Sequence, residues 1–239
     1  MSGTLEYVAE LSTLDPDRLK QVFNYLASQG TEVLPLLIES YGKNSDSGTR
    51  INILRAIGLV AFESDYYDPE LIKKVLSILD EICSVRMDPK KRNHMIATAV
   101  KVAGMIGDVD TSKRLLSFFS HNDSRVRANA VEGLAFILKR WSTQGCEGSK
   151  EALEKAVKDN DVRVSVTATV ALYLLHSVAA VSLKKRIDTL CHSGNEEIKN
   201  AAVTAAASFE IRSENFFDLF TPDSIFALLR FRKSCGNQY

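Results

Sequence analysis

Apolar residues recur at helical spacing along this chain, in a run that the sequence repeats with variations. The stretch 122–141, NDSRVRANAVEGLAFILKRW, opens with a polar turn and continues with apolar residues every three or four positions. This spacing is typical of an amphipathic helix. Related runs occupy 160–177 and 195–210, and two earlier segments, 50–62 and 93–107, fit the same register. The sequence therefore predicts one type of helix repeated along the chain.

The repeated runs align without gaps on one position, which we call the anchor column. It contains Arg55, Lys101, Glu132, Val170 and Thr204. The anchors are 46, 31, 38 and 34 residues apart, a spacing that suits a two-helix repeat. Each run also follows another apolar-periodic segment, at 31–42, 68–83, 110–120, 148–159 and 182–193. We therefore expect helix pairs joined by short polar turns, and we find no convincing strand pattern.

Aspartates and prolines stand where these helices are expected to begin. An aspartate side chain can accept hydrogen bonds from the free amides of a first helical turn, and proline suits the first helical position. The expected starts are Asp15-Pro16, Asp68-Pro69, Asp88-Pro89, Asp110, Asp123, Asp161 and Thr221-Pro222.

Two columns of small residues predict close packing between successive helices. One residue after the anchor lie Ala56, Val102, Gly133, Ala171 and Ala205, and two before it lie Ile53, Ala99, Ala130, Ala168 and Ala202. Small side chains let helices approach closely. A single helix pair cannot bury its apolar face alone, so stacked pairs are expected to share one continuous core.

The chain resembles the HEAT-repeat family of the bacterial type, with armadillo-like repeats as the nearest alternative. The segments that carry the resemblance are DSRVRANAVEGLAFI (123–137) and DVRVSVTATVALYLL (161–175). The resemblance implies an all-α, right-handed α-α superhelix of about five helix pairs in one domain, 1–239. In this interpretation 1–30 forms an N-terminal cap, 31–210 the repeats and 211–239 a C-terminal cap.

Composition limits the classes of function. The chain has 30 basic residues (Lys and Arg together) and 30 acidic residues (Asp and Glu together). This balance argues against binding to nucleic acid. No stretch is apolar enough to insert into a membrane, and the N-terminal residues lack a secretory pattern. The four cysteines, Cys83, Cys146, Cys191 and Cys235, have no metal-ligand spacing. We therefore expect a cytoplasmic protein without a metal, a cofactor or a small-molecule ligand.

In such a solenoid, the second helix of each pair lines the concave binding face. The buried columns leave the anchor column and the positions three and seven residues earlier exposed, and the position four residues later half-buried. The expected partner-binding residues are Arg55, Thr98, Lys101, Arg125, Asn129, Glu132, Phe136, Arg163, Thr167 and Val170. A mixed polar and apolar face of this kind suits a protein partner. The resemblance gives Arg125, Arg127 and Arg163 a second interpretation, as structural arginines that bind turn carboxylates of adjacent repeats.

Other HEAT-like proteins are enzymes, and their sequence signals are largely missing from this chain. The metal hydroxylases carry His-Glu dipeptides, which this sequence lacks. HEAT-like DNA glycosylases use aromatic and acidic residues on the concave side, but the expected exposed columns contain neither Asp nor Trp, and Trp141 ends a helix. Bilin lyase-like members would be supported by apolar groove residues such as Phe136 and Tyr173. The expected function is a non-catalytic scaffold or adaptor for a protein partner, with DNA binding or glycosylase activity, and lyase activity, as open alternatives.

Overall fold

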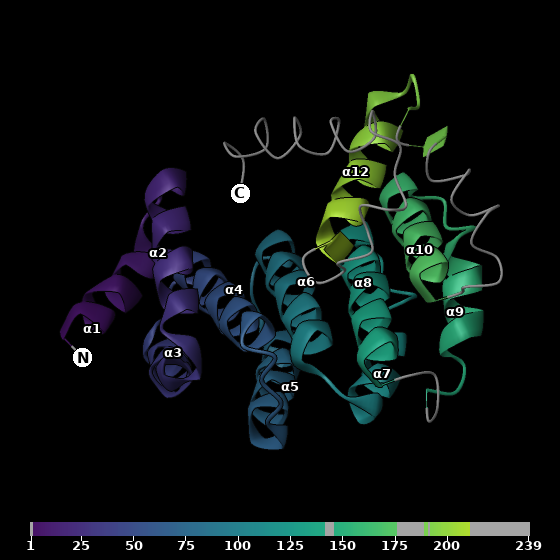
Figure 1. Cartoon of the computed structure of the whole chain (residues 1–239). Coiled ribbons are helices and arrows are strands. Elements are labelled where there is room, and N and C mark those ends of the chain that lie inside the picture. Colours follow the sequence, from purple (N-terminus) through teal and green to yellow (C-terminus); the bar gives the residue numbers. More distant parts are fainter. Residues whose placement is uncertain (1, 142–145, 176–188, 191, 211–239) are drawn as a thin grey trace.

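The computed structural model describes residues 2–141, 146–175, 189–190 and 192–210. Within these residues every regular element is a helix and none is a strand (Figure 1). The all-α class expected from the periodicity is therefore confirmed. The C-terminal cap expected at 211–239 lies outside the described residues, as do Cys191 and Cys235.

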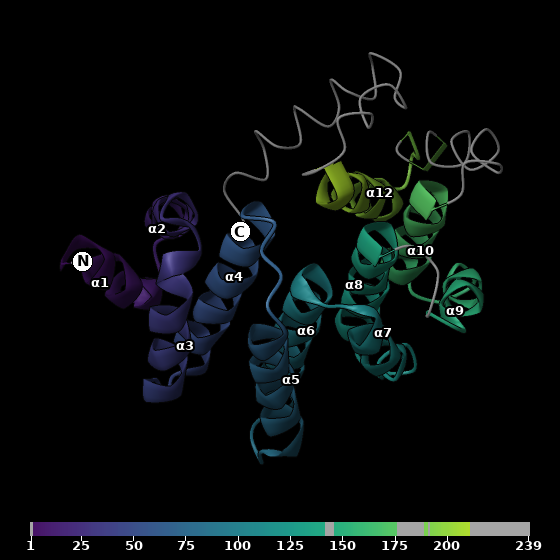
Figure 2. The same ribbon diagram turned by 60° about the horizontal axis from the view of Figure 1, so that its bottom comes forward.

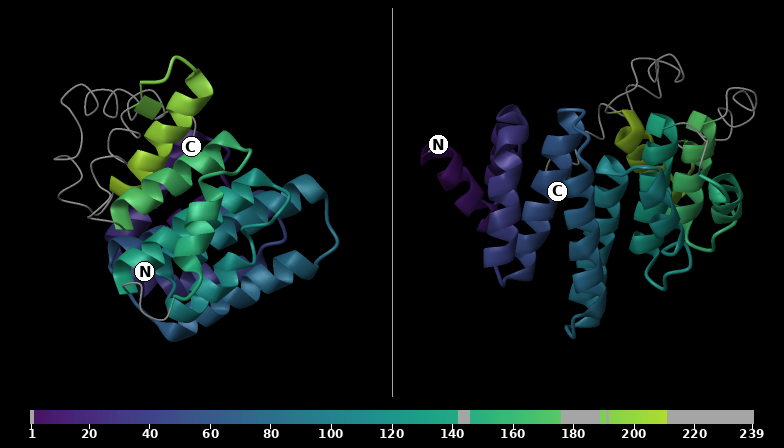
Figure 3. Two further views of the ribbon diagram at one scale, coloured as in Figure 1. Left: turned by 90° about the vertical axis from the view of Figure 1, so that its right-hand side faces the viewer. Right: turned by 90° about the horizontal axis from the view of Figure 1, so that it is seen from below.

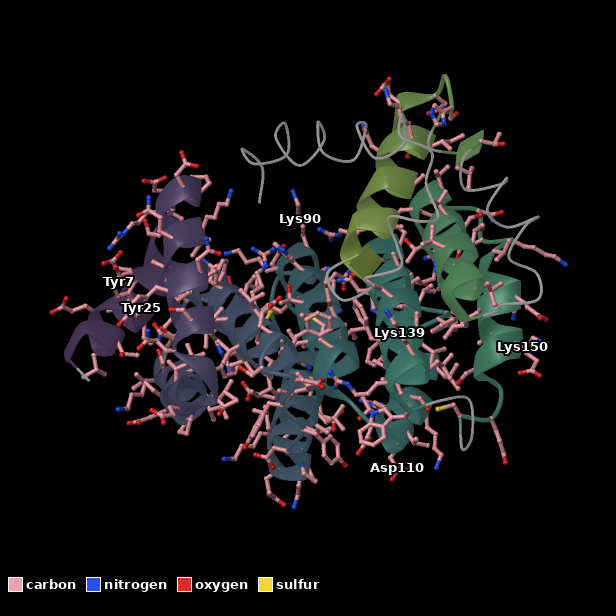
Figure 4. All side chains as sticks on the ribbon, viewed as in Figure 1. Tyr7, Tyr25, Lys90, Asp110, Lys139 and Lys150 are labelled. Carbon is pink, nitrogen blue, oxygen red and sulfur yellow. The ribbon has the colours of Figure 1, made fainter. Side chains whose placement is uncertain are left out.

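Two helices and two short 3-10 turns come before the repeats. They are α1 (Ser2–Ala9), η1 (Glu10–Ser12), α2 (Pro16–Ser28) and η2 (Gly30–Val33). Tyr7 of α1 stacks on Tyr25 of α2 with ring centroids 3.8 Å apart (Figure 4). Arg18 lies over the Tyr7 ring and pairs with Glu10. This N-terminal unit packs on the first repeat, where the Asn52 amide donates a hydrogen bond to the Leu11 carbonyl (3.0 Å).

The expected helix pairs follow in order along the chain. They are α3 (Leu34–Lys43) with α4 (Ser47–Glu63), α5 (Pro69–Ser84) with α6 (Pro89–Ile106), α7 (Val109–Leu116) with α8 (Ser124–Trp141), and α9 (Ser149–Ala156) with α10 (Val162–Leu175). Helix α12 (Glu196–Glu210) corresponds to the last repeated run.

The second helices form a continuous row. Helices α4, α6, α8, α10 and α12 each contact the next one, and each also contacts the first helix of its own pair where that helix is described. We call this arrangement the second-helix row. Figures 2 and 3 show that α5, α7 and α9 lie on one side of the row, with α1 at its N-terminal end.

Aspartate side chains cap the helix starts at the predicted positions, except that Asp46 was not predicted and Asp108 takes the place of Asp110. Asp15, Asp46, Asp68, Asp88 and Asp108 each accept a hydrogen bond from an amide of the first turn. Asp123 and Asp161 accept from the amides of Arg125 and Arg163. The expectation for Asp110 is wrong, because α7 begins earlier and Asp108 bonds both the amide and the hydroxyl of Thr111. Thr221-Pro222 lies outside the described residues.

One hydrophobic core runs through the described repeats. Both small-residue columns are buried as predicted, with Ala56, Val102, Gly133, Ala171 and Ala205 in one and Ile53, Ala99, Ala130, Ala168 and Ala202 in the other. The core extends without a break from Val8 to Ala205. This continuity agrees with the expectation that successive pairs bury a shared surface.

Helices α6 and α8 cross where two glycines face each other. A Cβ atom placed on Gly104 would lie 2.0 Å from the Cα atom of Gly133. Only two facing glycines allow the backbones to come this near, because any side chain would occupy the space of the other helix. This crossing fixes the spacing of the central repeats and therefore the surface that they expose.

Candidate functional site

The predicted partner-binding residues divide into exposed and buried groups. Arg55 and Arg163 are exposed, and Lys101, Arg125 and Phe136 are half-buried. The expectation of an exposed face is wrong for the other five: Thr98, Asn129, Glu132, Thr167 and Val170 are buried. The physical reason is that every helix inside the row is covered by a neighbour on both flanks, which a helix-by-helix alignment does not show. The side chain of Thr204 lies outside the described part.

Two of the buried polar residues hold backbone carbonyls. The Asn129 side-chain amide on α8 donates a 2.7 Å hydrogen bond to the Ala97 carbonyl on α6. The Thr98 hydroxyl donates to the His94 carbonyl within α6 (3.0 Å). A buried polar group needs such a partner, since leaving it unpaired costs about 1–3 kcal/mol. These contacts give Asn129 and Thr98 a structural role within the row.

Lys101 and Glu132 form an ion pair between α6 and α8. The Lys101 Nζ atom lies 3.1 Å from Glu132 Oε1, although the approach lacks hydrogen-bond geometry. The Glu132 residue is 5% exposed, so its carboxylate relies on this cation for charge compensation. Reversing either charge would therefore disturb the fold as well as any partner contact.

Replacing Lys101 with methionine is expected to lower the free energy of unfolding by about 1–2 kcal/mol, because the buried carboxylate loses its cation while the half-exposed lysine is partly screened. Adding Glu132→Gln should recover at least half of that loss, since the unpaired charge is then removed. Urea denaturation followed by circular dichroism measures both effects. A single substitution that costs less than about 0.5 kcal/mol would contradict the role of the pair.

The three arginines given a structural interpretation differ in their contacts. Arg127 donates two 2.8 Å hydrogen bonds to the Asp159 carboxylate in the turn of the next repeat, so the structural interpretation is confirmed for it. Arg125 instead binds Asp123 in its own turn (2.6 Å). Arg163 donates to the neutral Asn129 side-chain oxygen (3.3 Å). The expected contact with a carboxylate of an adjacent repeat is therefore wrong for Arg125 and Arg163.

Cationic groups from neighbouring helices meet around His94. A terminal guanidinium nitrogen of Arg55 lies 3.5 Å from His94 Nε2. The pKa of His94 is lowered by burial and then by the positive charges of Arg55 and Arg125, while Asp123 opposes the shift. The Arg125 guanidinium holds the pKa of Asp123 at about 2, so that carboxylate stays ionised at neutral pH. Arg55 is exposed overall, yet loss of water around it lowers its pKa.

We call Arg55, Arg125 and Arg163, together with His94, whose lowered pKa leaves its ring uncharged at neutral pH, the cationic row. The sequence placed His94, Arg125 and Arg163 in one column, seven residues before the anchor, but His94 was not among the candidate residues. A search for positive or titratable residues in that column would have found it. The meeting of Arg55 with His94 was not visible in the alignment, because it joins two different columns on adjacent helices.

A second group of residues joins the turns at the C-terminal ends of α4, α6 and α8. The Trp141 indole donates a 3.0 Å hydrogen bond to the Gly107 carbonyl, and its ring meets Tyr67 edge to face at 4.9 Å. Arg140 pairs with Asp65 (3.5 Å). Trp141 thus contacts two turns of neighbouring repeats. These contacts give it a structural role in packing the turns together.

Groups that could hold a metal were sought among the described residues, and none brings three His, Cys, Asp or Glu side chains together. His176 lies outside this part, and Cys83 and Cys146 are both free thiols. No helix in the described part is long and apolar enough to cross a bilayer. Comparison with models of known protein families and with characterised proteins gives no match.

Proposed function

We propose that the chain is a right-handed HEAT-type solenoid that acts as a non-catalytic scaffold or adaptor for a protein partner. Four features support this proposal: the repeated helix pairs, the caps at equivalent turns, the continuous core and the second-helix row. A row of stacked pairs presents an extended surface with one equivalent patch per repeat. Such a surface binds a partner through several small contacts on successive repeats.

One observation on the second-helix row carries the choice of a protein partner. Leu59 on α4, Met105 on α6 and Phe136 on α8 occupy equivalent positions of the repeat, and all three are half-buried. Leu59 lies one turn after Arg55 on α4, Met105 lies one turn after Lys101 on α6, and Phe136 lies on the same helix as Arg125. Partly exposed apolar side chains beside arginines are characteristic of protein interfaces, where methionine, aromatic residues and arginine are enriched. We call Leu59, Met105 and Phe136 the apolar line.

The apolar line can be tested with a photo-crosslinking amino acid. Benzoylphenylalanine at position 105 is expected to crosslink one defined protein in an extract of the source cells. Leu59→Gln in the same protein should reduce that product by about fivefold or more, because it removes an apolar contact from the interface. Mass spectrometry identifies the crosslinked partner, and gel densitometry measures its yield.

The control uses Ile78 on α5, which is also half-buried but belongs to a first helix. Benzoylphenylalanine at position 78 should give no defined product, and Ile78→Gln should leave the crosslink from position 105 unchanged. Equal products from positions 78 and 105, or no product from 105, would refute binding at the apolar line. Circular dichroism of every variant checks that the helices are retained.

A further inference from the structure

Two of the three arginines of the cationic row lack the carboxylate partner that most arginines of the described chain have. Outside the row, five described arginines are matched with acids, and Arg86 and Arg92 are not; the pairs are Arg18–Glu10, Arg50–Glu81, Arg114–Asp80, Arg127–Asp159 and Arg140–Asp65. In the row only Arg125 has a carboxylate partner among the described residues. The recorded side-chain contact of Arg55 is a histidine nitrogen, and that of Arg163 is a neutral amide oxygen.

Additional positive charge is disfavoured around His94 in the free protein. Arg55 and Arg125 both lower the pKa of His94, and loss of water lowers the pKa of Arg55. Nearby positive charges that lack a full complement of carboxylates gain more from an added anion than isolated surface lysines do. The guanidinium fork is also suited to hold a carboxylate with two parallel hydrogen bonds.

The spacing of the charges indicates the form of the anion. Packed helices lie about 8–10 Å apart, so the arginines on α4, α8 and α10 are spread over several helix spacings. A nucleic acid strand presents a phosphate about every 3.4 Å. In a peptide with the polyproline II conformation, which has three residues per turn, carboxylates on every third residue lie on one face about 9 Å apart.

We infer that the cationic row binds an acidic segment of a partner protein, with Asp or Glu side chains seated at Arg55, Arg125 and Arg163 on the second helices α4, α8 and α10. The inference rests on the proposed protein-binding function and adds the chemistry of the partner. Charge complementarity at the row sets the register and the rate of encounter, while the apolar line supplies the contact with apolar partner side chains. The row and the line together define one binding surface.

A fluorescein-labelled oligoglutamate of about 15 residues serves as the probe, measured by fluorescence anisotropy at roughly 50 mM salt, where screening is weak. The double variant Arg55→Gln/Arg163→Gln is expected to bind it about fivefold to tenfold more weakly than the wild type, the sum of two exposed ion pairs. Both arginines lack a carboxylate partner in the described structure, so replacing them leaves no carboxylate without its counter-charge. The probe should also shift the ring resonances of His94, assigned with His94→Gln.

The matched control is Arg86→Gln/Arg92→Gln. Arg86 precedes α6 and Arg92 lies in its first turn, near Cys83 of α5. Neither arginine pairs with a carboxylate in the part of the chain that the structure describes, and the change in net charge equals that of the test variant. Binding should stay within about twofold of the wild type, as expected for charges away from the contact.

Equal weakening in both double variants would overturn the inference, because it would show diffuse attraction to net charge. Tighter binding of an oligothymidylate of the same length, lost in Arg55→Gln/Arg163→Gln, would overturn it in favour of nucleic acid. The crosslink from position 105 separates this inference from the proposed function. If the crosslinked protein persists undiminished in Arg55→Gln/Arg163→Gln, the scaffold function stands and the acidic segment is refuted.

Discussion

Replacing Gly104 with alanine is expected to lower the free energy of unfolding by about 3 kcal/mol or more, the upper range for overpacking. The added Cβ would lie 2.0 Å from the Cα atom and 2.8 Å from the carbonyl carbon of Gly133. These are backbone atoms, so no side-chain rotation can relieve the clash, and α6 must move away from α8. Chemical denaturation followed by circular dichroism measures the loss.

Gly42 provides the control for this substitution. It lies near the end of α3, and a Cβ placed there meets no atom within 4 Å. Gly42→Ala should be neutral or stabilising by about 0.5–1 kcal/mol, because alanine favours a helix over glycine. Similar stability for the two variants would show that the α6–α8 crossing is not as close as described. It would also weaken the argument that this crossing buries Glu132 and Asn129.

Replacing Arg127 with methionine is expected to cost about 2–4 kcal/mol, since it breaks a mostly buried ion pair and leaves its partners unpaired. Arg127 holds the Asp159 carboxylate with two hydrogen bonds and also donates to the carbonyls of His121 (2.8 Å) and Asn122 (3.2 Å). It therefore ties the turn before α8 to the turn before α10. Thermal or urea denaturation measures the effect.

The same substitution at Arg114 serves as the comparison. Arg114 pairs with Asp80 on a more exposed surface, where the side chains are 41% and 62% exposed. Arg114→Met is expected to cost no more than about 1 kcal/mol, because water screens an exposed pair. Arg127→Lys should recover only part of the loss, since a lysine cannot make two parallel bonds to one carboxylate. Equal costs at positions 114 and 127 would contradict the structural role of Arg127.

The Arg127 contact also predicts the pH dependence of stability. The hydrogen bonds from Arg127 lower the pKa of Asp159 below its ordinary value of 3.8. The folded state therefore favours the ionised carboxylate, and this stabilisation is present above that ordinary value and is lost as the pH falls below it. The difference in stability between the wild type and Arg127→Met should accordingly be constant near neutral pH and shrink in acid.

These two substitutions act on the coupling between repeats, on which the proposed function depends. In a solenoid each repeat contacts only its neighbours, so stability and curvature are carried by the interfaces between repeats. Gly104 and Arg127 lie at such interfaces on either side of α8. A weakened interface would change the separation of Arg55, Arg125 and Arg163, and with it the register in which an acidic segment can bind.

The sequence predicted the helices well because the signals are local. The 3.6-residue spacing of apolar residues, and the aspartates that cap the first turns, act over a few residues and need no knowledge of the rest of the fold. The cap at Asp110 was misplaced for a related reason. Asp108 and Asp110 are both possible caps for the same helix, and the choice of Asp108 depends on the hydrogen bonds that it accepts from Thr111.

The candidate site was predicted less well because exposure is not local. Thr98, Asn129 and Thr167 are polar and lie outside the small-residue columns, so the alignment assigned them to the surface. The structure buries them because each inner helix of the row has a neighbour on both flanks. Glu132 is buried in the same way and finds its cation, Lys101, one repeat earlier.

By itself, the sequence determined an all-helical chain of repeated pairs with a shared core, since periodicity, small-residue columns and caps are properties of single segments. Only the tertiary structure decided which polar residues stay exposed and which cations meet. Those outcomes depend on how closely neighbouring helices approach, and the facing glycines of α6 and α8 set that distance at the centre of the row. The contact of Arg55 with His94 arises from the packing of α4 against α6, and neither helix by itself predicts it.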